Sequence, residues 1–235
     1  MEDIKLSKKG NALIKLYEEM AAKGIDRVDG TRKEKVYNDF QLRKFRHICK
    51  HQISNEKIKT VLDYGGGGSD WDAPGFDPGT KQSAKQFFQI QRVHTFEPAR
   101  GLMEKKKADC VVCMDVLEHI FIEDIPKVVN ELFFLAKKLV IVNVACYKAK
   151  ALLPNGENAH ITLRSPDWWK GVFDVTASNY KGTEVMLICS VTISSGVRYK
   201  TFKFGDYASV EGYTTEALFK VFGKKNRSPL SRRTF

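Results

Sequence analysis

Residues 61–70 read Val-Leu-Asp-Tyr-Gly-Gly-Gly-Gly-Ser-Asp and carry the strongest structural signal in the chain. The short apolar run that ends in an acidic residue is too short for a helix and predicts a buried strand. Glycines directly after a strand let the backbone turn sharply and let a ligand approach the main chain without meeting a Cβ atom. In an open parallel sheet, ligands bind just outside the carboxyl ends of the strands. The stretch therefore predicts a small-molecule cofactor across a glycine-rich turn.

The length and composition indicate one large domain. The chain has 235 residues, 43% of them apolar, which is enough to bury a sizeable core. No apolar run approaches the roughly 18 residues of a membrane span, and residues 1–5 begin no apolar signal-peptide segment. We therefore expect a cytoplasmic protein with no membrane partner.

The five cysteines predict reduced thiols, because they are odd in number and scattered through the chain. Cys110 and Cys113 have the C-x-x-C spacing, but they lie inside an apolar, strand-like run and no second such pair exists. We therefore expect no metal site.

The net charge of +11 leaves two explanations open, a lysine-rich solvated surface and an anionic partner such as nucleic acid. Part of the excess is local, because residues 224–235 carry five positive charges. We expect residues 224–235 to form a basic, disordered tail and residues 1–223 to form a single domain. The folded body is then only mildly basic, so a nucleic-acid partner is not favoured.

Apolar periodicity predicts an α/β fold. Helices are expected at residues 3–23 and 31–51, as a lid formed by residues 1–51, and strands and helices alternate after them. The expected strands lie at residues 60–64, 92–97, 109–115, 139–145, 184–193 and 197–204, and the expected helices at residues 79–90, 123–137, 166–172 and 214–222. This order predicts a mostly parallel sheet with right-handed crossovers, and the turn at residues 194–196 predicts a C-terminal antiparallel hairpin.

The glycine turn has a spacing that excludes two common phosphate-binding loops. It reads Asp63-x-Gly65-x-Gly67-x-Ser69. No reading frame supplies the last glycine of the dinucleotide fingerprint G-x-G-x-x-G, and the Gly-Lys-Ser/Thr of the P-loop is absent. The turn resembles the D/E-x-G-x-G-x-G first motif of class I S-adenosylmethionine (SAM) methyltransferases.

Further stretches support this resemblance. The second strand ends at Glu97, and residues 108–120 read A-D-C-V-V-C-M-D-V-L-E-H-I, similar to the fourth-strand segment of that family. Residues 139–146 resemble its fifth strand, and residues 153–169 resemble a segment of a bacterial and phage branch with D-Y-G-x-G first motifs. The resemblance covers roughly residues 58–175 and implies a Rossmann-like sheet with SAM as cofactor.

The resemblance also implies how the first two strands would hold SAM. Gly65 and Gly67 would pass beneath the methionine part of the cofactor, and Asp63 would orient its ammonium group. A carboxylate at the end of the second strand can accept both hydroxyls of a ribose, so Glu97 would bind there.

Asp115 and Val116 would border the cofactor from the fourth strand.

The chain departs from the family between its second and fourth strands. Residues 99–108 are too few to form a crossover with an extra strand and helix. We therefore expect a shortened sheet of about six strands.

Two histidines are candidate catalytic residues. Methyl transfer needs a general base only when the acceptor carries a proton at working pH. His160 follows the fifth strand on the cofactor side of the sheet and is the first candidate base, although a histidine there can also hold loop backbone. His119 follows the fourth strand at the same edge, where packing and capping of the next helix is the alternative.

The resemblance names no methyl acceptor. The first interpretation is a methyltransferase for a small molecule. The alternatives are a methyltransferase for RNA or another large anionic partner, and a SAM-binding module without catalysis. The [D/N]-P-P-[Y/F] motif of nucleic-acid amino-methylating enzymes is replaced here by Asp115-Val116-Leu117-Glu118, and the Pro-Cys of cytosine-carbon enzymes is absent. The acceptor and the oligomeric state are not set by the sequence.

Overall fold

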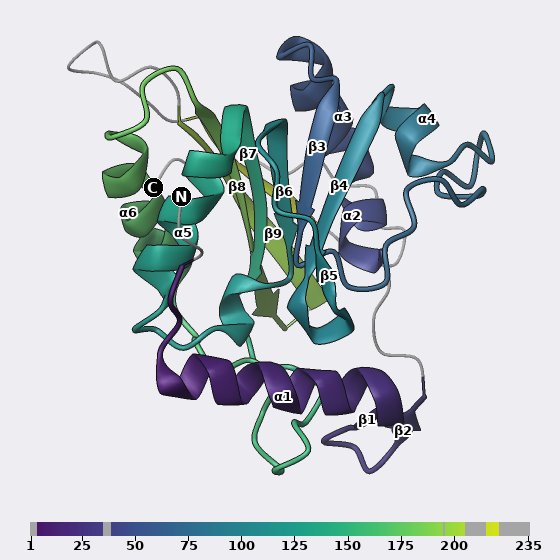
Figure 1. Cartoon of the computed structure of the whole chain (residues 1–235), viewed down its shortest axis with the longest axis vertical. Helices are drawn as coiled ribbons and strands as arrows, with labels where there is room; N and C mark the ends of the chain where they lie inside the picture. The colour runs from purple at the N-terminus through teal and green to yellow at the C-terminus, as the bar shows by residue number, and fades with distance from the viewer. Residues whose placement is uncertain (1–3, 35–38, 195, 205–214, 221–235) are drawn as a thin grey trace.

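The computed structural model describes residues 4–34, 39–194, 196–204 and 215–220 (Figure 1). A central sheet of eight strands has the order β10-β9-β8-β7-β6-β3-β4-β5. Its strands are β3 (Thr60–Tyr64), β4 (Arg92–Glu97), β5 (Leu102–Met103), β6 (Ala108–Met114), β7 (Ala136–Ala145), β8 (Glu184–Ile193), β9 (Gly196–Phe204) and β10 (Thr215–Lys220). A separate ribbon pairs β1 (Ile25–Asp26) with β2 (Arg32–Lys33).

The central strands β4, β3, β6, β7 and β8 run parallel, and β5, β9 and β10 run antiparallel to their neighbours. The helices are α1 (Lys8–Lys23), α2 (Phe40–Lys44), α3 (Arg46–Asn55), α4 (Ala84–Phe88), α5 (Ile125–Leu135) and α6 (Pro166–Ala177), with two 3₁₀ helices, η1 (Pro98–Arg100) and η2 (Leu117–His119). The predicted α/β fold, with a mostly parallel sheet and a C-terminal antiparallel hairpin at β8 and β9, is confirmed.

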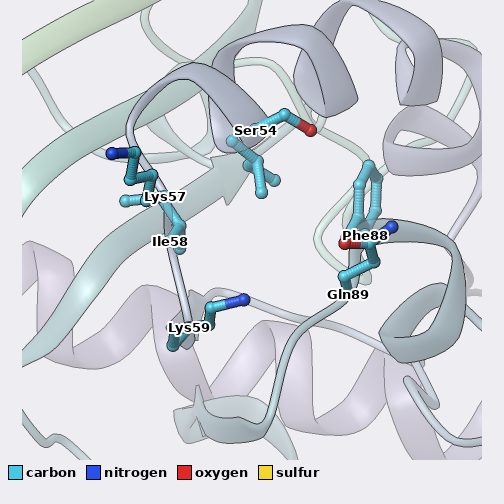
Figure 2. Close-up of a pocket in the computed structure, with 7 residues that line it drawn as sticks. Ser54, Lys57, Ile58, Lys59, Phe88 and Gln89 are labelled. Carbon is cyan, nitrogen blue, oxygen red and sulfur yellow. The ribbon is translucent and has the colours of Figure 1, made fainter.

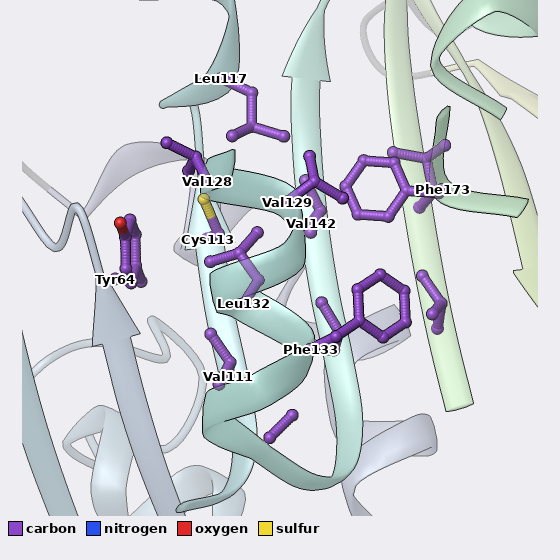
Figure 3. Packing of buried hydrophobic residues seen from close by; sticks show 14 of the residues in the cluster. Tyr64, Val111, Cys113, Leu117, Val128, Val129, Leu132, Phe133, Val142 and Phe173 are labelled. Carbon is purple, nitrogen blue, oxygen red and sulfur yellow. The ribbon is translucent and has the colours of Figure 1, made fainter. Parts of the chain in front are cut away.

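Two apolar clusters, one on each face of the sheet, form the core. On one face, α5 packs Val128 and Leu132 against β6, and α6 adds Phe173 (Figure 3). On the other face, α3 and α4 pack against Cys110 and Val112 of the same strand. Because β6 is covered on both sides, its residues 110–114 form a continuous apolar run. Cys110 and Cys113 lie in different clusters, so the C-x-x-C spacing brings no thiol pair together.

Several predicted elements are wrong in extent or type. The sheet has eight strands instead of about six, because the short β5 and the distal β10 extend its two edges. The predicted helix at residues 214–222 is β10, which pairs with β9 in antiparallel register. Pairing along a sheet edge here outweighs the weak local preference of a short segment. The predicted tail, residues 224–235, lies outside the described residues.

The second N-terminal helix is shorter and divided. Residues 32–33 pair as β2, and the helical part splits into α2 and α3 on either side of Phe45. The predicted helix at residues 79–90 begins only at Ala84, after Ser83 and Gln86 form a capping box. Tertiary contacts and capping residues determine where these helices begin and end, and apolar periodicity does not detect them.

Helix α1 crosses the carboxyl ends of the parallel strands (Figure 1). Its residue Tyr17 donates a hydrogen bond of 3.0 Å to the carbonyl of Ala159, in the loop after β7. Leu13 and Met20 pack in a small cluster with Leu153 and Ala159 from the same loop. The N-terminal segment therefore covers the edge at which the sequence predicts a ligand. Among the described residues, no helix has the length and apolar character to cross a membrane.

Asp124→Ala should undock α1 and lower the free energy of unfolding by about 2–4 kcal/mol. The carboxyl group of Asp124 is fully buried and accepts hydrogen bonds from the Ser7 N–H (2.8 Å) and hydroxyl (2.7 Å), so its loss leaves two partly buried donors unpaired. Urea unfolding and hydrogen exchange of residues 8–23 measure the effect. Asp26→Ala, which breaks only an exposed ion pair with Arg32, should change stability by less than about 1 kcal/mol. An equal loss in both variants would contradict the anchoring role.

Candidate functional site

The glycine turn begins where β3 ends. Gly65 has a φ angle of +73°, and its N–H donates to the carbonyl of Phe96 over 2.7 Å. A Cβ atom on Gly65 would lie 2.4 Å from Cγ2 of Val116, so the position requires glycine. Gly67 also has a positive φ, of +54°. The turn therefore lies directly against Val116, as expected for two segments that border one site.

Asp63 is buried next to this turn. Its Oδ2 accepts a hydrogen bond of 2.7 Å from the indole N–H of Trp71, a partner that the sequence analysis missed. Burial raises the pKa of Asp63 to about 6, the Trp71 hydrogen bond opposes the rise, and the charge of Glu97 adds to it. Within the described part of the chain, no ion pair includes Asp63.

Glu97 closes the turn from the end of β4. Its Oε2 accepts the N–H of Gly67 over 2.9 Å, and its Oε1 accepts the N–H of Ala99 over 3.1 Å. Burial raises the pKa of Glu97, and the two backbone hydrogen bonds and the charge of Arg100 oppose the rise. The guanidinium of Arg100 also donates to the carbonyl of Gly67. Glu97 thus holds the glycine loop in addition to being available for a ligand.

The two carboxyl groups fit the polar ends of SAM. Burial disfavours the ionised form of Asp63. The ammonium group of a ligand beside Asp63 would stabilise that form by its positive charge. Each oxygen of a carboxylate has two lone pairs, so Glu97 can accept ribose hydroxyls while it keeps both backbone donors. The residues predicted from the first two strands are therefore brought together, with suitable chemistry, around one turn.

A second group of polar side chains lies beside the turn, beyond the ends of β6 and β7. Asp115 directly follows β6, His119 ends η2, and His160 lies in the loop after β7. One nitrogen or carboxylate oxygen of each residue lies within 4.8 Å of those of the other two. The structure therefore places His119 and His160, the predicted catalytic residues, next to Asp115, which is predicted to border the cofactor.

Both histidines are held by main-chain carbonyls. Nδ1 of His119 lies 2.9 Å from the carbonyl oxygen of Ala159, and Nδ1 of His160 is bonded to that of Tyr147. The two rings pack edge to face with centroids 4.8 Å apart. Burial, followed by the proximity of His160, lowers the pKa of His119 to about 4, so its imidazole is neutral near pH 7.

Glu118 is a site residue that the sequence analysis did not assign. It is fully buried, accepts the N–H of Ala145 through Oε1 and has no partner for Oε2 among the described residues. Burial, and then the charge of Asp115, raises the pKa of Glu118 well above its ordinary value. Its position inside the D-V-L-E-H-I segment was the available signal.

The N-terminal segments contribute three more contacts. The hydroxyl of Tyr17 in α1 lies 2.9 Å from Nδ1 of His119. In α2, Nε2 of Gln41 donates to Oδ1 of Asp115 over 3.4 Å, and the charge of Asp115 acts on the ammonium of Lys44. Long-range packing creates these contacts, and no local motif marks them.

A pocket of about 270 Å³ lies elsewhere, between the end of α3 and the end of α4 (Figure 2). Its lining includes Lys57, Lys59 and Gln89, which precede β3 and β4 in the chain. It therefore opens at the amino ends of these strands, opposite the glycine turn, and its lining has no carboxyl group. We do not assign it to the predicted cofactor.

The comparisons with known proteins are sparse. No family model matches the chain, and no curated protein matches it. A similar solved structure is that of an O-methyltransferase family protein from Burkholderia thailandensis, with 16% sequence identity and a TM-score of 0.33. The match covers 72% of this chain and 58% of that protein, so the chain spans less than two thirds of its length. The α/β fold is therefore assigned from the sheet order of the chain itself.

Proposed function

We propose that this protein is a SAM-dependent methyltransferase that acts on a small molecule. One observation carries the proposal: Asp63 and Glu97, two buried carboxyl groups at the ends of neighbouring parallel strands, flank a glycine turn and form no ion pair among the described residues. A ligand with a cationic end and a hydroxyl-bearing ring would satisfy both. SAM has these features and would supply an activated methyl group.

The residues of the chain would act mainly by positioning. Holding an acceptor in line with the methyl group can supply several kcal/mol of the barrier. Asp63 and Glu97 would fix the two ends of the cofactor, and α1 would exclude water from the edge that it crosses. His119 and His160, which lie together beyond β6 and β7, are the groups proposed to act on the acceptor.

An RNA or another large anionic acceptor is the alternative, and the basic segment at residues 31–51 is the surface that would bind it. Two of its cations are already paired within the protein. The guanidinium of Arg43 pairs with Asp39 and also donates to a main-chain carbonyl, and Arg46 pairs with Asp77. These cations stabilise the protein's own structure. A steep salt dependence of RNA binding would favour this alternative, because phosphate contacts release counterions. SAM binding without transfer to any acceptor would favour a non-catalytic module.

Calorimetric titration of SAM between pH 5 and 8 tests the proposal. The pKa of Asp63, about 6, lies above its ordinary value, so Asp63 is protonated below pH 6. An ammonium group binds the ionised form, so SAM affinity should rise about tenfold per pH unit below 6 and level off above it. Asp63→Asn, which keeps an acceptor for Trp71, should bind weakly and with a flatter pH profile. Absence of SAM binding by the wild-type chain would refute the proposed function.

A further inference from the structure

We propose that Asp115, His119 and His160 form a binding site for one divalent transition-metal ion. One donor atom of each lies within 4.8 Å of the other two. Ligands about 2.1 Å from one ion lie about 3.4 Å apart at tetrahedral angles, so a pair at the limit of 4.8 Å would close by about 1.4 Å, or about 0.7 Å for each side chain, to complete the set. Two imidazoles and one carboxylate around an ion are an established ligand set that leaves further positions open.

The hydrogen bonds of the two histidines support this assignment independently. Nδ1 of His119 contacts the carbonyl of Ala159, and Nδ1 of His160 contacts that of Tyr147. A carbonyl oxygen only accepts, so Nδ1 carries the proton in both rings and Nε2 keeps its lone pair. Histidines that bind metals usually have this arrangement, in which the second ring nitrogen is fixed by a carbonyl or carboxylate.

The backbone at Asp115 supplies a third observation. Asp115 has a φ angle of +62°, which residues other than glycine rarely adopt and which is concentrated at functional sites. Its N–H donates to the carbonyl of Asn143 over 3.0 Å. Asn143 is fully buried and donates in turn to the carbonyl of Ile188 over 2.9 Å. The main chain that carries the carboxylate is therefore held beside the two imidazoles by the centre of the sheet.

The ligand set predicts which ions bind. Imidazole nitrogens favour Zn²⁺, Co²⁺ and similar ions, whereas Mg²⁺ and Ca²⁺ prefer oxygen ligands alone. Three protein ligands leave room for an acceptor with a hydroxyl or carboxylate oxygen to bind the ion. This last step rests on the proposed function, whereas metal binding itself does not.

Co²⁺ is the probe for the test. It is titrated into the full-length chain, without a histidine tag and freed of metal by a chelator, and followed by visible absorption and calorimetry. We expect one Co²⁺ per chain and no displacement by equimolar Mg²⁺. Asp115→Asn, which suits the positive φ angle, and His160→Gln should each weaken binding at least about a hundredfold, because even outer contacts of a metal site contribute roughly 10- to 100-fold.

His51→Gln is the matched control, since His51 is exposed in α3 and its ring contacts the side chain of Asn55, away from the proposed site. Co²⁺ should raise the melting temperature of the wild type and of His51→Gln, but not that of the two site variants, whose melting without metal reports their folding. Equal Co²⁺ affinity in the wild type and either site variant, or no saturation by millimolar Co²⁺, would overturn the metal site. SAM is titrated into the same samples. SAM binding without Co²⁺ binding would refute the metal site alone. Co²⁺ binding without SAM binding would refute the proposed function alone.

Discussion

Glu97→Ala should abolish measurable SAM binding and lower the free energy of unfolding by about 2–4 kcal/mol. The change removes the proposed acceptor for the ribose hydroxyls. It also leaves the buried N–H groups of Gly67 and Ala99 without their carboxylate, and hydrogen bonds to a charged group contribute about 1.5–3 kcal/mol each. The burial that raises the pKa of Glu97 offsets part of this contribution. Calorimetry with SAM and urea unfolding measure the two effects.

Glu97→Gln separates the two roles of this side chain. The amide keeps one oxygen that can accept from Gly67 or Ala99, so about half of the stability loss should be recovered. It replaces the other acceptor by a donor, so SAM binding should remain at least tenfold weaker than in the wild type. Wild-type SAM affinity in Glu97→Ala would exclude Glu97 from the cofactor site, and an unchanged stability would exclude its role in the turn.

Gly65→Ala should destabilise the protein by about 2–5 kcal/mol and prevent SAM binding. Two costs add. An alanine at a φ angle of +73° is strained by about 1–2 kcal/mol, and its Cβ would lie 2.4 Å from Cγ2 of Val116, an overlap that costs a further 1–3 kcal/mol or so. Relief of the overlap requires a shift of the turn or of Val116, and both border the proposed cofactor site. Thermal and urea unfolding, with SAM titration of the folded fraction, measure the result.

Gly75→Ala is the matched control for Gly65→Ala. Gly75 has a similar φ angle, +82°, but a Cβ atom there would meet no atom within 4 Å. Its cost should therefore be the backbone strain alone, about 1–2 kcal/mol, with SAM affinity unchanged. The double variant Gly65→Ala, Val116→Ala should recover the difference. Equal losses in the two single glycine variants would show that Val116 does not restrict the turn.

The sheet could be predicted closely because its strands are marked by local chemistry. Residues 60–64, 92–97 and 184–193 were predicted as strands with the bounds that the structure has. Residues 60–64 and 184–193 are mostly apolar, and residues 92–97 place Val93 and Phe96 among polar side chains directly before Pro98. A strand that is covered on both faces is rich in apolar residues, so its position can be predicted from the sequence. The glycine turn was predictable for a similar reason, since the close approach of Val116 tolerates no other residue at Gly65.

The ends of the helices and the edges of the sheet were not predictable in this way. The segment 31–51 has helical periodicity, yet β2 takes its first residues into a ribbon with β1. Residues 215–220 pair with β9, although their pattern suits a helix. Short segments have weak local preferences, and a partner strand that is distant in the sequence decides between them.

The same distinction between local sequence signals and tertiary contacts applies to the candidate site. The strand-and-turn motif predicted that Asp63 and Glu97 lie close together, because the carboxyl ends of neighbouring parallel strands lie at one edge of a sheet. Only the tertiary structure pairs Asp63 with Trp71 and places His119 and His160 edge to face beside Asp115. The loop after β7 carries His160 back across this edge, where packing against α1 holds it. Spacing along one strand or turn is a local property of the chain, whereas the meeting of two loops depends on the free energy of packing the whole fold.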